Sequence, residues 1–184
     1  GNPTITVEGN LIFPNQSSNA IFNFGGSGGN AFSIDLRGNF SLSENDSSIS
    51  VPITFTGTNA QTITRNTGSI SGTWTINKAN NTVTPTTNFT KTGAINIDSG
   101  TLSAAGYNIS ATSITINSGG VLQLRGAETI TSPTSNTGAL VRFTGDGDTL
   151  GDVYTVSNLA TAYYDLEINS TDGVTDSFVL ANDI

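Results

Sequence analysis

Apolar and polar residues alternate along most of this chain, in short stretches separated by Gly, Asn and Asp. One recurring stretch reads large apolar residue, polar residue, Ile, then Asn or Asp, and it is found at 74–77, 95–98, 114–117 and 166–169. The first three copies follow one another at a nearly constant interval. A period of two is typical of strands that bury one face, and Asn or Asp suits the turn that ends a strand. The pattern predicts an all-β chain without long helices.

Two further patterns repeat at longer intervals. Apolar residues alternate around a central Gly at 5–13 and 34–42, and again at 89–97, where Lys91 interrupts the apolar row. A third pattern links 53–57 to 141–145. A period near 20 thus lies inside a period near 90. We therefore expect one repeat-built β domain over 1–184, with N-terminal coils (1–50), a first long repeat (51–138) and a second, truncated one (139–184).

The return of a strand-and-turn unit every ~19–26 residues favours a parallel β-solenoid, in which each unit forms one coil. Equivalent residues of successive coils would then stack. Ile76, Ile97 and Ile116 would form an inward row, and Asn77, Asp98 and Asn117 a ladder at the corner. The alternative is a β-sandwich with antiparallel hairpins, which explains the alternation but not the constant interval.

The composition of the chain argues mainly against certain classes of function. The chain has 184 residues, of which 35% are hydrophobic and 11% charged, with a net charge of −8. Phosphate contacts need clustered Lys and Arg, so nucleic acid is a poor partner. The lack of Cys and His removes disulfides, thiolate metal sites and the usual base of a catalytic triad. The chain contains no apolar run of about 18 residues, so the sequence does not predict a membrane-spanning helix. It does not begin with Met, which suggests a piece of a longer protein.

The repeats resemble those of large secreted bacterial surface proteins, the adhesins and autotransporter-like passengers. The stretches that carry the resemblance are TFTGTNAQTIT (54–64), INIDSGTLSAAGYNI (95–109), ITINSGGVLQL (114–124) and the final segment 163–184. The resemblance implies a right-handed parallel β-helix, a location outside the cell at its surface, and a structural or adhesive role without catalysis. It names no ligand.

The acidic loop 146–152 contains the strongest candidate site. Asp146, Asp148 and Asp152 place three carboxylates on a Gly-rich loop, which suits a hard cation such as calcium. Leu150 stands where an EF-hand loop usually carries a ligand, and the distal Glu of such a loop is missing. The alternative interpretation is a solvated acidic turn without an ion.

Adjacent aromatic residues supply the second candidate. Tyr163 and Tyr164 would point to opposite faces of a strand, so one of them should be exposed as a contact residue. An exposed Tyr is compatible with a carbohydrate-binding module, the alternative function, whose partner would be a surface polysaccharide. A polysaccharide-cleaving enzyme needs converging carboxylates, and no cluster of that kind stands out, so we do not expect an enzyme.

The strand expected at 5–13 suggests a partner for the other end of the chain. A rod built of parallel strands has unpaired backbone groups at its open ends. We expect the end near Ile184 to pair with adjoining repeats of the same chain, or with residues 5–13 of another copy in a head-to-tail fibre.

Overall fold

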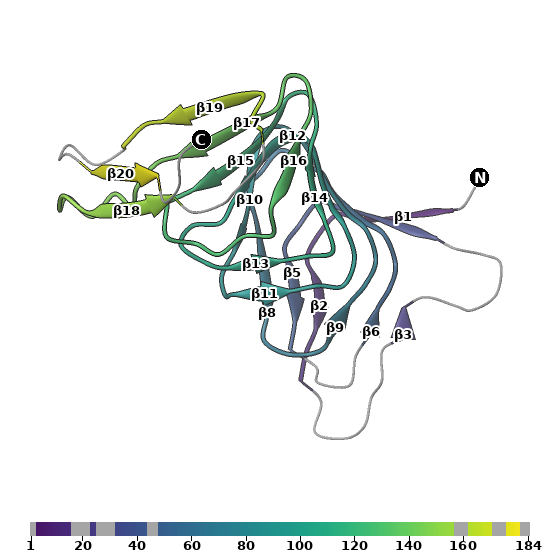
Figure 1. The fold of residues 1–184 in the computed structure, drawn as a ribbon. Coiled ribbons are helices and arrows are strands. Elements are labelled where there is room, and N and C mark those ends of the chain that lie inside the picture. Colours follow the sequence, from purple (N-terminus) through teal and green to yellow (C-terminus); the bar gives the residue numbers. More distant parts are fainter. Residues whose placement is uncertain are drawn as a thin grey trace.

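The computed structural model describes residues 3–15, 23–24, 32–43, 48–156, 162–170 and 176–180. In this part the chain is all-β and winds into a parallel β-solenoid of about six turns (Figure 1). Each named strand pair is parallel, so the predicted solenoid is confirmed and the sandwich, which requires antiparallel hairpins, is wrong. The right-handed winding stays a prediction. The described part contains no helix that could cross a membrane.

The strands form three rows along the solenoid. The first row contains β1 (Thr4–Val7), β4 (Ser33–Leu36), β7 (Ile53–Phe55), the starts of β10 (Trp74–Pro85) and β12 (Ile95–Ser103), β14 (Ile114–Ile116) and β16 (Pro133–Ser135). The second row contains β2 (Leu11–Phe13), β5 (Phe40–Leu42), β8 (Gln61–Arg65), the ends of β10 and β12, β15 (Gly120–Leu124), β17 (Leu140–Phe143) and β19 (Asp165–Ile168).

The third row is divided into short sheets. Its strands are β3 (Asn23–Phe24), β6 (Ser48–Ile49), β9 (Ser69–Ile70), β11 (Phe89–Thr90), β13 (Ile109–Ser110), β18 (Val153–Val156) and β20 (Ser177–Leu180). The strands β10 and β12 continue from the first row into the second and so join these two rows into one 13-stranded sheet. The N-terminal strands and the C-terminal strands lie at opposite ends of the molecule (Figure 1).

The length of a coil agrees with the predicted interval except at the start. The sequence separation between facing side chains of neighbouring coils is 19 for Asp98 and Asn117, and 25 for Arg142 and Glu167. The first coil is longer, because Thr4 faces Ser33 at a sequence separation of 29. The additional residues fall between β2 and β4, so a coil of this solenoid can be lengthened by insertion between strands.

The predicted inward row is confirmed. Ile76, Ile97 and Ile116 occupy equivalent positions in β10, β12 and β14, and all three are buried. Aromatic rings fill part of the same core around Trp74, which packs edge-on against Phe40 at 5.1 Å and Phe55 at 5.3 Å between ring centroids. Alternation therefore places the apolar side chains inside, as stacking of successive coils requires.

The predicted corner ladder is confirmed in part. Asn117 donates from Nδ2 to Oδ1 of Asp98 at 2.6 Å and accepts from Asn136 at 2.7 Å, so the ladder continues one coil further than predicted. Asn77 is not in line with Asp98, because a register shift between β10 and β12 places it opposite Ser99, whose hydroxyl donates to it at 2.9 Å.

Copies of one sequence pattern do not always occupy the same row. The segment at 53–55 is in the first row as β7, whereas its counterpart at 141–143 is in the second row as part of β17. Likewise 166–168 belongs to second-row β19, although its counterparts at 74–76 and 95–97 are in the first row. All three rows need a strand with one apolar face, so the same sequence pattern can occupy any of them. The proposed boundaries of the long repeats stay a prediction.

Candidate functional site

The acidic loop lies between β17 and β18, near the C-terminal end of the solenoid. Its backbone is sharply bent, with positive φ at Gly145, Gly147 and Thr149. A Cβ on Gly145 would overlap the carboxylate of Asp176, so glycine is required there for space as well as for conformation. The bends let nearby side chains of the loop turn toward one point.

The three carboxylates predicted as metal ligands converge in the folded chain. Asp146, Asp148 and Asp152 each offer an oxygen, and these atoms all lie within 4.8 Å of one another. Asp146 and Asp152 are half-buried and Asp148 is exposed. The loop also folds on its own side chains, since the N–H of Leu150 donates to Oδ1 of Asp148 at 2.8 Å. Like charges this close repel, and a hard cation bound between them would remove that repulsion.

Two buried polar residues adjoin the loop. Asp176 accepts from the N–H of Asp152 at 3.1 Å and from the hydroxyl of Ser170 at 3.0 Å. Tyr154 is only 8% exposed, and its buried hydroxyl has no hydrogen-bond partner among the described residues. Burial, followed by the charges of Asp146, Asp176 and Asp152, raises the pKa of Tyr154 to about 12. The Asp146 carboxylate approaches this hydroxyl without closing a hydrogen bond of ordinary geometry.

The predicted aromatic pair differs in exposure. Tyr164 is 54% exposed, whereas Tyr163 is half-buried and packs against the hydrophobic core. They lie before β19 rather than within a strand, and the N–H of Tyr164 donates to the hydroxyl of Ser135 at 3.1 Å. A contact role for Tyr163 and Tyr164 stays a prediction.

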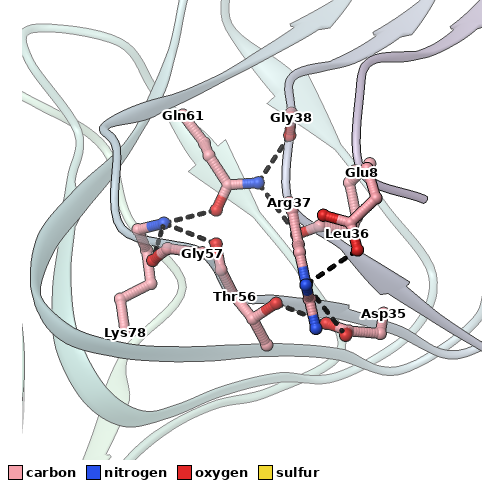
Figure 2. Close-up of polar contacts among 9 residues, drawn as sticks. All are labelled: Glu8, Asp35, Leu36, Arg37, Gly38, Thr56, Gly57, Gln61 and Lys78. Atoms are coloured by element: carbon pink, nitrogen blue, oxygen red, sulfur yellow. Dashed lines mark hydrogen bonds and ion pairs between the residues drawn. The ribbon is translucent and has the colours of Figure 1, made fainter. Parts of the chain in front are cut away.

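Sequence reasoning missed a buried polar network in the N-terminal half. Lys78 is 1% exposed and points into the solenoid, where its Nζ donates to the carbonyl oxygens of Thr56 at 2.7 Å and Gly57 at 3.3 Å (Figure 2). It also donates to Oε1 of Gln61 at 2.5 Å, and the Gln61 amide in turn donates to the carbonyl of Leu36 at 2.9 Å. This chain of contacts connects three successive coils.

A second buried lysine lies further along the same coil, directly after β11. Lys91 is 3% exposed, donates to the carbonyl oxygens of Gly72 at 2.8 Å and Ala94 at 2.9 Å, and lies 5.5 Å above the Trp74 ring. Burial lowers the pKa of both lysines, that of Lys91 to about 8. The apolar–polar alternation does indicate that these two lysines are internal. Lys78 and Lys91 both stand at positions where the pattern predicts an inward apolar residue.

The surface beside the Lys78 network carries a row of charged and polar groups (Figure 2). Arg37 pairs with Glu8 at 2.8 Å and with Asp35 at 3.4 Å, and the hydroxyl of Thr56 donates to Asp35. These groups come from three successive coils and line a shallow depression. The two carboxylates share one guanidinium, so this arrangement ties coils together.

These features define the chain as a β-solenoid with an acidic loop and internal lysines. It matches no family model, no curated protein and no solved structure.

Proposed function

We propose that this chain is a structural and adhesive segment of an extracellular cell-surface protein, and that copies of it join end to end into a fibre. The observation that carries the proposal is the state of the two ends of the described solenoid, where inward-facing apolar side chains are uncovered. The resemblance of the repeats to secreted bacterial surface proteins supports the location. The scarcity of charged residues, 11% of the chain, agrees with a scaffold whose walls are Thr, Ser and Asn.

The N-terminal end has an open strand edge. Ile5 lies opposite the buried Ile34 in register, yet Ile5 itself is 48% exposed because no strand of the described chain covers it. In the second row, Leu11 is aligned with Phe40 and is only half-buried. Backbone groups along such an edge are ready to pair with another parallel strand.

The C-terminal end of the described solenoid is open in the same way. Leu166 lies opposite the buried Val141 and Ile168 lies opposite the buried Phe143. Leu166 is 40% exposed and Ile168 is 50% exposed, although both continue an inward row. Another coil in register would bury them.

The C-terminal end of one copy is complementary to the N-terminal end of another. Strand β19 presents inward apolar residues two positions apart, and β2 presents Leu11 and Phe13 with the same spacing in the same row. Parallel pairing of β19 with β2 of another copy would place Glu167 opposite the uncharged Ile12. The Glu167 carboxylate is already held by Arg142 at 2.7 Å. A head-to-tail contact of this kind leaves both outer ends free and therefore propagates.

The first experiment blocks one end. Replacing Leu166 and Ile168 by Lys places two ammonium groups in the row that the next copy must cover, so we expect particles of monomer mass by light scattering where the wild type forms larger ones. The matched control carries Thr73→Lys and Ser110→Lys, which make the same change in net charge at exposed positions away from both ends. The control should assemble as the wild type does.

Mixing two blocked variants tests the direction of assembly. The variant with Ile5→Lys and Leu11→Lys should also be monomeric, and a mixture of the two variants should stop at dimers, because each retains one intact end. A wild-type chain that stays monomeric at high concentration would overturn the fibre. Dimers formed by either blocked variant alone would replace the head-to-tail contact with a symmetric one.

A further inference from the structure

The buried hydroxyl of Tyr154 lies beside the acidic loop and has no hydrogen-bond partner among the described residues. Gly145 lies against the hydroxyl end of the Tyr154 ring, since a Cβ there would be 3.7 Å from Cε2, and Gly126 lies against the other end of the ring. The hydroxyl is therefore directed toward the start of the loop, where Asp146 follows Gly145. It is more than nine-tenths buried and has no hydrogen-bond partner among the described residues. A buried hydroxyl without a partner is uncommon in folded proteins, and a bound water or ion is an ordinary explanation.

We infer that this loop binds one calcium ion through Asp146, Asp148 and Asp152, with the Tyr154 hydroxyl donating to a water molecule held by the ion. Calcium accepts six to eight oxygen ligands at about 2.3–2.6 Å, so ligands on opposite sides of the ion lie roughly 4.6–5.2 Å apart. Three carboxylate oxygens within 4.8 Å of one another fit inside that sphere. The remaining ligand positions would be taken by water and by carbonyl oxygens of the loop.

The geometry of the loop favours calcium over magnesium. Magnesium requires near-ideal octahedral geometry at about 2.0–2.1 Å, which favours compact, rigid ligand sets. Here one ligand, Asp148, is exposed, and the three carboxylates come from a bent loop rather than from paired strands. A site with three carboxylates and several waters should bind in the range of extracellular calcium modules, with a Kd of about 0.1–1 mM.

Binding would hold the last described coils together. The loop joins β17 to β18, and the N–H of Asp152 donates to Asp176, the residue that precedes β20. An ion on Asp152 therefore acts on a segment that connects two successive coils. We expect about 5 mM CaCl₂ to raise the melting temperature of the purified chain by about 3–6 °C.

Titration calorimetry with CaCl₂ tests the site directly. The wild type should bind one ion, and Asp148→Asn should lose the binding heat and the thermal shift. Asp165→Asn removes the same charge from an exposed carboxylate outside the cluster and should keep both. Magnesium chloride and sodium chloride at equal ionic strength serve as further controls, since a chain of net charge −8 is stabilised by any screening salt.

Tyr154→Phe tests the second part of the inference. The hydroxyl lacks a protein partner among the described residues, so its removal should leave the calcium-free melting temperature unchanged or slightly higher, while calcium affinity falls several-fold. A loss of calcium-free stability would mean that the hydroxyl has a protein partner and would overturn its role at the ion. Equal responses to calcium, magnesium and sodium, or unaltered calcium binding by Asp148→Asn, would overturn the site.

Discussion

At the scale of single residues, the two internal lysines show how a cation is accommodated inside a solenoid. An ammonium group has three donors, and Lys78 uses them on two carbonyl oxygens and one side-chain amide oxygen. Lys91 uses two carbonyl oxygens and the face of Trp74. Corner carbonyls face the interior where the chain leaves one row for the next, so they can accept these bonds. The hydrogen bonds offset part of the cost of burying the charge.

The Lys91 ammonium gives a prediction about pH. Its folded-state pKa is lowered to about 8 from the ordinary value of 10.5, so between these values the unfolded chain binds a proton that the folded chain does not. Stability rises with pH wherever the unfolded state binds more protons. The unfolding free energy of the wild type should therefore increase relative to Lys91→Met from about pH 8 to pH 10.5, by at most about 1.4 kcal/mol per pH unit.

Urea unfolding of both proteins at several pH values measures this difference. Thr90→Met, at an exposed neighbouring position, is the control and should show no such trend relative to the wild type. A difference that is constant across this pH range, or that declines, would show that Lys91 does not lose its proton early in the folded state.

At the scale of strands and turns, amide side chains connect successive coils in two different ways. Asn117 uses both ends of its amide, donating to Asp98 and accepting from Asn136. Among the described residues, Asn39 uses only its side-chain oxygen, which accepts from the backbone N–H of Thr62 in the next coil at 2.8 Å. An amide that donates to a carboxylate cannot be replaced by another carboxylate, whereas one that only accepts can be.

The same substitution should therefore differ in effect at these two positions. Asn117→Asp replaces a donor by a carboxylate facing Asp98, which removes one charge-assisted hydrogen bond and adds repulsion, and we expect a loss of about 1–2 kcal/mol. Asn39→Asp keeps the acceptor for Thr62 and should cost less than about 1 kcal/mol. Chemical denaturation of both variants compares them, and equal losses would contradict the ladder geometry.

At the scale of the whole molecule, the solenoid depends on contacts between neighbouring coils and has no closed end in the described part. Stability in such a structure is close to a sum over coils and their interfaces, so an uncovered end coil gains from any partner that continues the rows. Net charge opposes this gain. Each copy carries −8, and copies repel one another over a distance set by the salt concentration.

End-to-end assembly should therefore become stronger as salt increases. The Debye length falls from about 30 Å at 0.01 M salt to about 8 Å at 0.15 M, which removes most of the repulsion but leaves the apolar contacts of β19. Light scattering at fixed protein concentration should show larger particles at the higher salt. The end-blocked variant should not respond, and particles that shrink with added salt would point to an interface of ion pairs instead.

The alternation of apolar and polar residues was enough to predict the strands and the buried face of the row through Ile97, because a period of two decides locally which face is buried. The nearly constant interval between repeats was enough to predict the parallel solenoid, because each repeat forms one coil. The sequence placed Asp146, Asp148 and Asp152 on one Gly-rich loop, where three carboxylates can converge, and the folded chain brings their oxygens within 4.8 Å of one another. Only the tertiary structure decided which row each repeat occupies, that Asn77 faces Ser99, and that Tyr154 lies beside the carboxylates. These outcomes depend on the lengths of the corners and on the register shifts of all preceding coils. The local sequence around a residue does not contain that information.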